Sequence, residues 1–131
     1  MHILTIKDET ALGKVLHELE LSLSEDIITV RELIRQRVYA EVEAYNRKAD
    51  EVFHGLVQPT DAEATLNGYR MKGKTSFVDP EKQFYVALDA FMKNGFFILV
   101  DDRQVEGLEE KILVAEDTSV SFVKLTQLVG G

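Results

Sequence analysis

The sequence ends on "SFVKLTQLVGG", and the terminal carboxylate of Gly131 is the one group that this pattern marks for chemistry. Glycine loses more backbone freedom on ordering than any other residue, so Gly130 and Gly131 add nothing to a strand. Glycine does let a backbone pass through a narrow channel whose walls would clash with a side chain. The pair therefore fits a carboxylate presented to another protein, or else a frayed chain end without function.

The other reactive side chains form no pattern typical of a catalytic or metal site. His2, His17 and His54 lack metal-ligand spacing, although His2 and His17 lie on the two strands of one expected hairpin. The acidic pairs 101–102 and 109–110 fall in predicted turns, where carboxylates are common. The stretch "GYRMKGKTS" lacks the spacing and context of a phosphate-binding loop. We therefore expect no metal, no cofactor and no catalysis by the chain itself.

Composition and charge limit the class of protein. The 131 residues suit one domain with a single core, and the lack of cysteine excludes disulfides and thiolate chemistry. No apolar run approaches the roughly 18 residues of a membrane span, and the start lacks a secretion signal. We therefore expect a cytoplasmic protein with no membrane contact. A net charge of −8 argues against nucleic-acid binding, although the stretches "RELIRQR" and "YRMKGK" are locally basic.

The first half of the chain predicts a hairpin followed by a long helix. An apolar strand precedes the turn residues "KDETALGK", and from Leu19 on apolar and polar residues alternate as in a half-buried strand. Thr29 and Glu32 predict a helix start. Helical spacing over residues 30–53 gives an apolar stripe of Val30, Leu33, Ile34, Val38, Val42, Tyr45, Ala49 and Val52. This helix, about 35 Å long, extends past a small sheet and needs a second partner.

The second half predicts helices and then strands. A short helix is expected after Thr60, and Asp79 and Pro80 begin another that ends before Gly95. Its apolar stripe is Phe84, Ala87, Leu88, Phe91 and Met92. Three strands follow, at residues 96–100, 103–105 and 120–125, with "EGLEEKIL" as a loop or single helical turn. The fold class is therefore α+β, a mixed sheet of four to five strands holding a long helix, which is the β-grasp plan.

Two blocks of the sequence resemble ubiquitin and ubiquitin-like proteins. Residues 1–38 share the apolar first strand, the hairpin and "DIITVRELI" at the helix start. Residues 96–131 are similar to the last half of ubiquitin in order and spacing: strand, two-residue turn, polar pair before a hydrophobe, short loop, charged turn, strand and di-glycine. The resemblance implies one ubiquitin-like domain over 1–131 with a tail at 126–131. Residues 46–94 then form a large helical insertion between the first helix and the third strand, as expected of a bacterial ubiquitin-like protein.

The resemblance also implies a function as a protein modifier. An adenylating (activating) enzyme would join the Gly131 carboxylate to the α-phosphorus of ATP and pass the acyl group to a cysteine. A conjugating enzyme would deliver it to an amine of a target protein, and an isopeptidase would remove it. Thr126, Gln127, Leu128 and Val129 would form the recognised tail that keeps the folded body outside the enzyme's channel.

The sequence contains less evidence for a partner-binding surface outside the tail. Counting back from the glycines places Leu99 and Leu125 at positions that match ubiquitin's apolar sheet patch, although both leucines also suit a core. The residues 120–125 do not alternate cleanly, so a register shift or bulge is an open alternative. Lys7, Lys14 and Lys111 could each accept a chain linkage, as could the other lysines, and no sequence feature selects one.

Two other functions remain open. A sulfur carrier would use the same carboxylate as a thiocarboxylate, since the resemblance covers those carriers too. Alternatively, the sheet and the insertion bind a partner without conjugation, and the glycines have no role.

Overall fold

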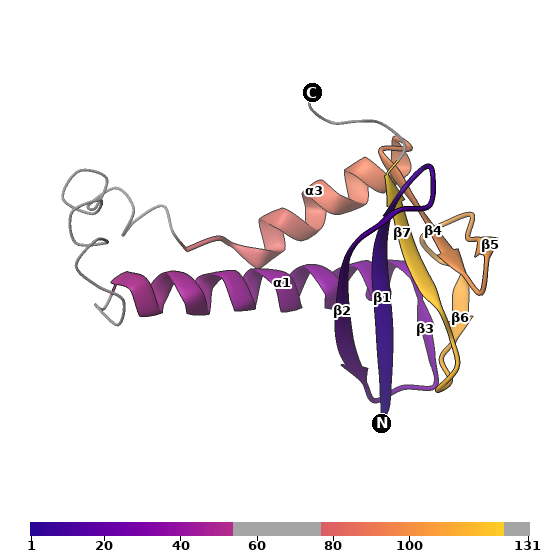
Figure 1. Ribbon diagram of the computed structural model, residues 1–131, viewed down its shortest axis with the longest axis horizontal. Helices are drawn as coiled ribbons and strands as arrows, with labels where there is room; N and C mark the ends of the chain where they lie inside the picture. The colour runs from indigo at the N-terminus through magenta and orange to yellow at the C-terminus, as the bar shows by residue number, and fades with distance from the viewer. Residues whose placement is uncertain (54–76, 125–131) are drawn as a thin grey trace.

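The computed structural model describes residues 1–53 and 77–124, with side chains described for 1–48 and 77–124. The fold is α+β, with a five-stranded mixed sheet packed against a long helix (Figure 1). Several predicted features lie outside the described residues. They are His54, the helix expected after Thr60, the stretch "GYRMKGKTS" and residues 125–131.

The N-terminal hairpin consists of β1 (His2–Thr10) and β2 (Val15–Leu23), which pair antiparallel. The predicted turn "KDETALGK" was too long, because its first four residues belong to β1. These residues, 7–10, also pair in parallel with 121–124 of the last strand, and this second neighbour keeps them extended. Gly13 lies in the remaining turn with φ 93°, a conformation that glycine adopts without strain.

The chain's last strand lies in the middle of the large sheet. The strands β4 (Phe96–Val100), β5 (Arg103–Gln104) and β7 (Val120–Lys124) complete the order β2-β1-β7-β4-β5. Strands β1 and β7 are parallel and the other neighbours are antiparallel. Asp101 and Asp102 join β4 to β5 with φ of 52° and 68°, the signs that a two-residue type I′ hairpin turn requires. This sheet is mixed, as expected, and is compatible with a β-grasp-like arrangement.

A second, two-stranded sheet was not predicted. It pairs β3 (Ile27–Thr29) antiparallel with β6 (Lys111–Leu113), which had been expected to be loop or helical turn. Strands of three residues are too short to show a period in sequence. Hydrogen bonds next to the two strands hold them in place. The backbone N–H groups of Val30 and Arg31 donate to the carbonyls of Glu110 and Leu108, respectively, both at 2.9 Å. The loop before β6 thus satisfies free donors at the helix start.

Two of the three predicted helices are confirmed as α1 (Val30–Phe53) and α3 (Pro80–Met92). The Thr29 hydroxyl accepts the backbone N–H of Glu32 at 3.1 Å, and the Asp79 carboxylate accepts that of Glu81 at 2.9 Å, as capping residues do. Neither helix of the described ranges is long and apolar enough to cross a membrane.

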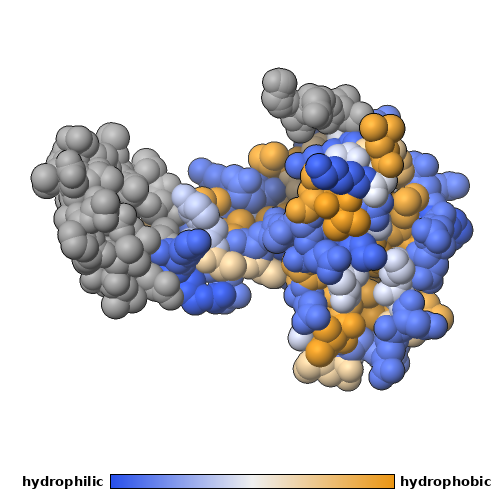
Figure 2. Space-filling view, in the orientation of Figure 1, coloured by the Kyte–Doolittle hydropathy of each residue, from blue (hydrophilic) through white to orange (hydrophobic). Residues whose placement is uncertain are grey.

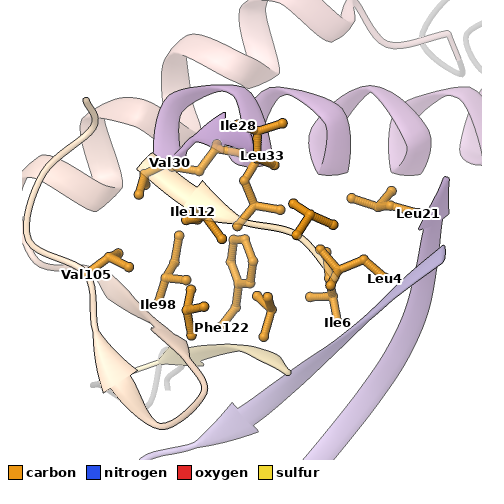
Figure 3. Packing of buried hydrophobic residues seen from close by; sticks show 14 of the residues in the cluster. Leu4, Ile6, Leu21, Ile28, Val30, Leu33, Ile98, Val105, Ile112 and Phe122 are labelled. Atoms are coloured by element: carbon orange, nitrogen blue, oxygen red, sulfur yellow. The ribbon is translucent and has the colours of Figure 1, made fainter. Parts of the chain in front are cut away.

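One face of the large sheet packs on α1 to form the core (Figure 3). Alternating residues Leu4 and Ile6 of β1, Ile98 and Val100 of β4, and Val120 and Phe122 of β7 point into it. The first turns of α1 contribute Val30, Leu33 and Ile34 from the other side. Of the predicted α1 stripe, Tyr45 was wrongly assigned and is 52% exposed, while the side chains of Ala49 and Val52 lie outside those described.

The second half of α1 extends beyond the sheet and has α3 alongside it (Figure 1). The Asn46 side chain donates to the Val78 carbonyl at 2.9 Å and accepts the Val78 N–H at 2.8 Å, which fixes the segment before α3 to α1. Leu88 and Phe91 of α3 belong to the main core, whereas Met92 was wrongly assigned to the apolar stripe and is 67% exposed. The predicted partner for α1 is therefore α3, while the division of residues 46–94 from the rest stays a prediction.

Candidate functional site

The central strand β7 directs the chain toward its C-terminal residues. Its last residue, Lys124, pairs with Thr10 at the end of β1 and with Phe96 at the start of β4. The described part of β7 therefore stops at the end of the sheet that also carries the β1–β2 turn (Figure 1). The residues predicted as tail and activation site come after Lys124 in the sequence and lie outside the described residues. They are Thr126, Gln127, Leu128, Val129, Gly130 and Gly131.

A buried ion pair anchors this end of β7. Arg37 of α1 donates from both terminal nitrogens to Asp8 of β1, one of them at 2.6 Å, and also to Glu41 at 2.9 Å. The guanidinium lies 4.6 Å from the ring centroid of Phe122 in β7. Desolvation lowers the pKa of Arg37, but the bonds to Asp8 and Glu41 outweigh it and raise the pKa above its ordinary value. The helix and both strands are thereby held together at Phe122, two residues before the last described residue, Lys124.

The sheet face opposite α1 carries the predicted patch residue Leu99. In β4, Leu99 lies opposite Ser121 and Phe97 lies opposite Val123, so all four side chains share this open face. Leu99 and Phe97 are half-buried and Val123 is buried. The register therefore brings Val123 beside Phe97 and Leu99, whereas Leu125, the residue predicted with Leu99, lies outside the described residues.

The irregular apolar pattern of β7 reflects burial on both faces. Its pairing with β1 and with β4 runs from Val120 to Lys124 without a shift, so the suspected slip is absent from this strand. Val120 and Phe122 face the core, while Ser121 and Val123 are 8% and 5% exposed on the open face. Apolar residues on both sides are typical of a central strand.

Charged residues divide the open face into small apolar areas. Lys7 lies opposite Glu18 across the β1–β2 pair, and the Glu9 carboxylate accepts the Ser121 hydroxyl at 2.8 Å. Figure 2 shows hydrophobic and hydrophilic side chains interspersed over the part of the sheet that it displays. A partner of this face would therefore combine a small apolar contact with polar contacts.

The histidines of the described residues are not brought together. His2 pairs with Leu23 at one end of the hairpin and His17 with Asp8 near the other. The Nε2 atom of His2 lies 2.7 Å from Asp26, and this hydrogen bond holds the pKa of Asp26 below its ordinary value. Within residues 1–53 and 77–124, no group of three or more histidine, aspartate or glutamate side chains is placed to hold a metal ion.

The three candidate acceptor lysines occupy different surroundings. Lys7 is half-buried on the open face, whereas Lys14 in the β1–β2 turn and Lys111 on β6 are exposed. Lys14 and Lys111 are therefore the more accessible of these three candidates.

Sequence reasoning missed two features of this region. Phe97 and Val123 follow from strand alternation once the register is known, and "FFILV" alone does not reveal which residues face the core. Arg37 interrupts the apolar face of α1 next to Val38, and that interruption was the available signal for a buried ion pair.

Comparison with protein-family models, with curated proteins and with solved structures found no match to this chain.

Proposed function

We propose that this chain is a ubiquitin-like β-grasp protein that modifies other proteins through the carboxylate of Gly131. The observation that carries the proposal is the sheet order β2-β1-β7-β4-β5 with α1 across one face. In this order the last strand is central and parallel to the first, and it is followed by residues 125–131 with Gly130–Gly131 at their end.

The proposed chemistry takes three transfers. A carboxylate oxygen of Gly131 attacks the α-phosphorus of ATP, which forms an acyl-adenylate and releases pyrophosphate. A cysteine thiolate of the activating enzyme then displaces AMP and forms a thioester. An amine of the target displaces the thiolate and leaves an amide bond. This chain contributes the carboxylate and its presentation, and the enzymes supply the catalysis.

The anchor of β7 supports the presentation of the tail. Arg37, Asp8 and Phe122 fix the end of the sheet at which the described part of β7 stops. A rigid body at this point gives an activating enzyme a defined surface to recognise next to the proposed tail. The adenylating enzyme, the conjugating enzyme and the target proteins are accordingly the partners of this proposal.

The sequence itself provides a specific test. Trypsin cuts after Lys124, so a target modified through Gly131 retains the peptide Leu-Thr-Gln-Leu-Val-Gly-Gly on the acceptor amine. We expect mass spectrometry of tagged protein expressed in its native host to find this remnant on lysines of other proteins. Deletion of Gly130 and Gly131 should abolish the remnant-bearing adducts. The matched glycine control is Gly107→Ala, since a Cβ there meets no atom within 4 Å.

The same experiment separates the competing functions. A purified chain in which one C-terminal oxygen is replaced by sulfur, without remnant-bearing targets, supports the sulfur carrier. Absence of both products, with an ATP–pyrophosphate exchange that does not respond to the protein, rejects activation at Gly131 altogether.

A further inference from the structure

The outer edge of β4 is only partly covered. Strand β5 pairs with β4 only at Leu99 and Val100, and the last bond of this ladder runs from the Val105 N–H to the Ile98 carbonyl at 3.0 Å. Groups of alternate residues point to the same side of a strand, so the N–H and carbonyl of Phe96 also face this edge. Within the described residues, no strand lies opposite Phe96 on that side. Among the described residues, the edge therefore offers the backbone N–H and carbonyl of Phe96 without a strand partner.

A groove adjoins this open edge. Its volume is about 470 Å³, and it lies between the start of β4, the C-terminal end of α3 and the loop 105–109. Phe91, Phe96 and Leu108 provide apolar walls, and the exposed Met92 lies at its margin. Pockets that hold ligands span roughly 300–1,000 Å³, so this groove can accommodate a few residues of an extended chain.

The far wall of the groove is held by its own hydrogen bonds. The Glu110 carboxylate accepts the Glu106 N–H at 2.8 Å and pairs with Arg103 at 2.7 Å. The Leu108 carbonyl accepts the Arg31 N–H, and the Arg31 side chain pairs with Glu109 at 2.6 Å. The loop is therefore fixed to the start of α1 through Arg31 and to β5 through Arg103, so the groove is formed without a partner. Figure 3 places Val105, where the loop leaves the strand, beside Ile98 at the margin of the core.

The groove has an acidic margin. Glu106 and Glu109 are exposed and line it, and among the described residues Glu106 has no ion-pair partner. Arg31 is the one cation among the lining residues and is paired to Glu109. The whole chain carries a net charge of −8. A basic partner is therefore favoured both at the groove and at a distance.

We propose that this groove binds an extended peptide segment of a partner protein, which adds to the sheet as a strand at the open edge of β4. The main chain of the peptide bonds to the backbone N–H and carbonyl of Phe96, next to the point where Val105 already occupies the edge at Ile98. One large apolar side chain packs between Phe91 and Leu108, and a lysine or arginine next to it lies against Glu106. Strand addition of this kind takes affinity from the main chain and specificity from alternate side chains. The site is independent of any reaction at Gly131.

A steric variant gives a direct test. Gly107 lines the groove and a Cβ there meets no atom within 4 Å, so we expect Gly107→Phe to be tolerated and to add bulk beside the groove. The probe is a library of random nine-residue peptides displayed on phage and selected on the full chain alone. We expect enriched peptides that combine a large apolar residue with a neighbouring lysine or arginine. Their affinity should fall at least tenfold on Gly107→Phe.

Matched variants locate the contact independently. Met92→Glu at the groove margin should weaken the selected peptides at least tenfold, whereas Val86→Glu, at a similarly exposed position of α3 outside the groove, should not. Glu106→Lys should weaken them in a salt-dependent manner, and a peptide N-methylated opposite Phe96 should lose binding. Thermal unfolding and the amide spectrum of each variant show whether it folds.

The outcomes decide the proposal. Peptide-induced amide shifts at Phe96, Ile98 and Leu108 support it. No enrichment of peptides, equal binding to Gly107→Phe, or shifts confined to the other sheet edge at β2 would each overturn it.

Discussion

Arg37 and Asp8 form an ion pair between α1 and β1 in which both side chains are largely buried, with 12% and 15% of their surfaces exposed. The pair lies beside Phe122 of the central strand and thus connects the helix to the two parallel strands. Removing one member leaves a desolvated charge without its partner, and this is the most destabilising way to alter a buried pair.

Asp8→Asn should therefore lower the free energy of unfolding by about 2 kcal/mol at neutral pH, the scale of a hydrogen bond to a charged group. Urea unfolding measures this change. The control is Arg31→Gln, which breaks an arginine–carboxylate pair whose members are 46% and 72% exposed and should change stability by less than about 1 kcal/mol. Equal losses for the two variants would contradict the burial of the Asp8 pair.

The register of β1 predicts that truncating the adjacent residues Leu4 and Ile3 changes the free energy of unfolding by very different amounts. Leu4 is 1% exposed in the core and Ile3 is 58% exposed on the open face. Leu4→Ala should lower the free energy of unfolding by about 3 kcal/mol, because it removes buried methyl groups and leaves a cavity. Ile3→Ala should lower it by less than about 1 kcal/mol. A larger loss for Ile3 would mean that the strand is shifted by one residue, since such a shift exchanges the two faces.

The Asn46 side chain predicts how the α3 segment is attached to α1. It needs both its donor and its acceptor, because it bonds to the carbonyl and the N–H of Val78. Asn46→Asp keeps an acceptor but loses the donor, and places a carboxylate against a carbonyl. We expect faster hydrogen exchange of the Val78 amide and a loss of about 1 kcal/mol of unfolding free energy. Exchange unchanged from the native protein would show that the contact does not hold this segment.

The Glu110 carboxylate predicts a pH-dependent loop. The hydrogen bond from the Glu106 N–H, aided by Arg103, holds the pKa of Glu110 below its ordinary value of 4.5. Because folding lowers this pKa, the stabilisation is complete above 4.5 and is lost as the pH falls through the lower folded value. The Glu106 amide shift should follow this titration, and Glu110→Gln should remove it. A midpoint at or above 4.5 would contradict the bond.

The sequence determined the elements with strong local signals. Helices α1 and α3 were predicted from their capping residues, Thr29 and Asp79, and from the helical spacing of the apolar residues that follow each cap. Both signals depend only on residues that are close together in the chain. The β1–β2 hairpin and the Asp101–Asp102 turn followed for the same reason. The type of fold, a mixed sheet with a long helix, also followed from the order of these elements.

Only the tertiary structure decided the features that depend on residues distant in the chain. Strands β3 and β6 are three residues each and exist because Val30 and Arg31 bond to the loop before β6. Residues 7–10 are strand and not turn because β7 lies beside them. The order and register of the strands also decide three further features: the neighbours of Leu99, the burial of Arg37 and the groove at β4. No local pattern encodes such long-range pairings, because they result from the packing of the whole sheet on α1.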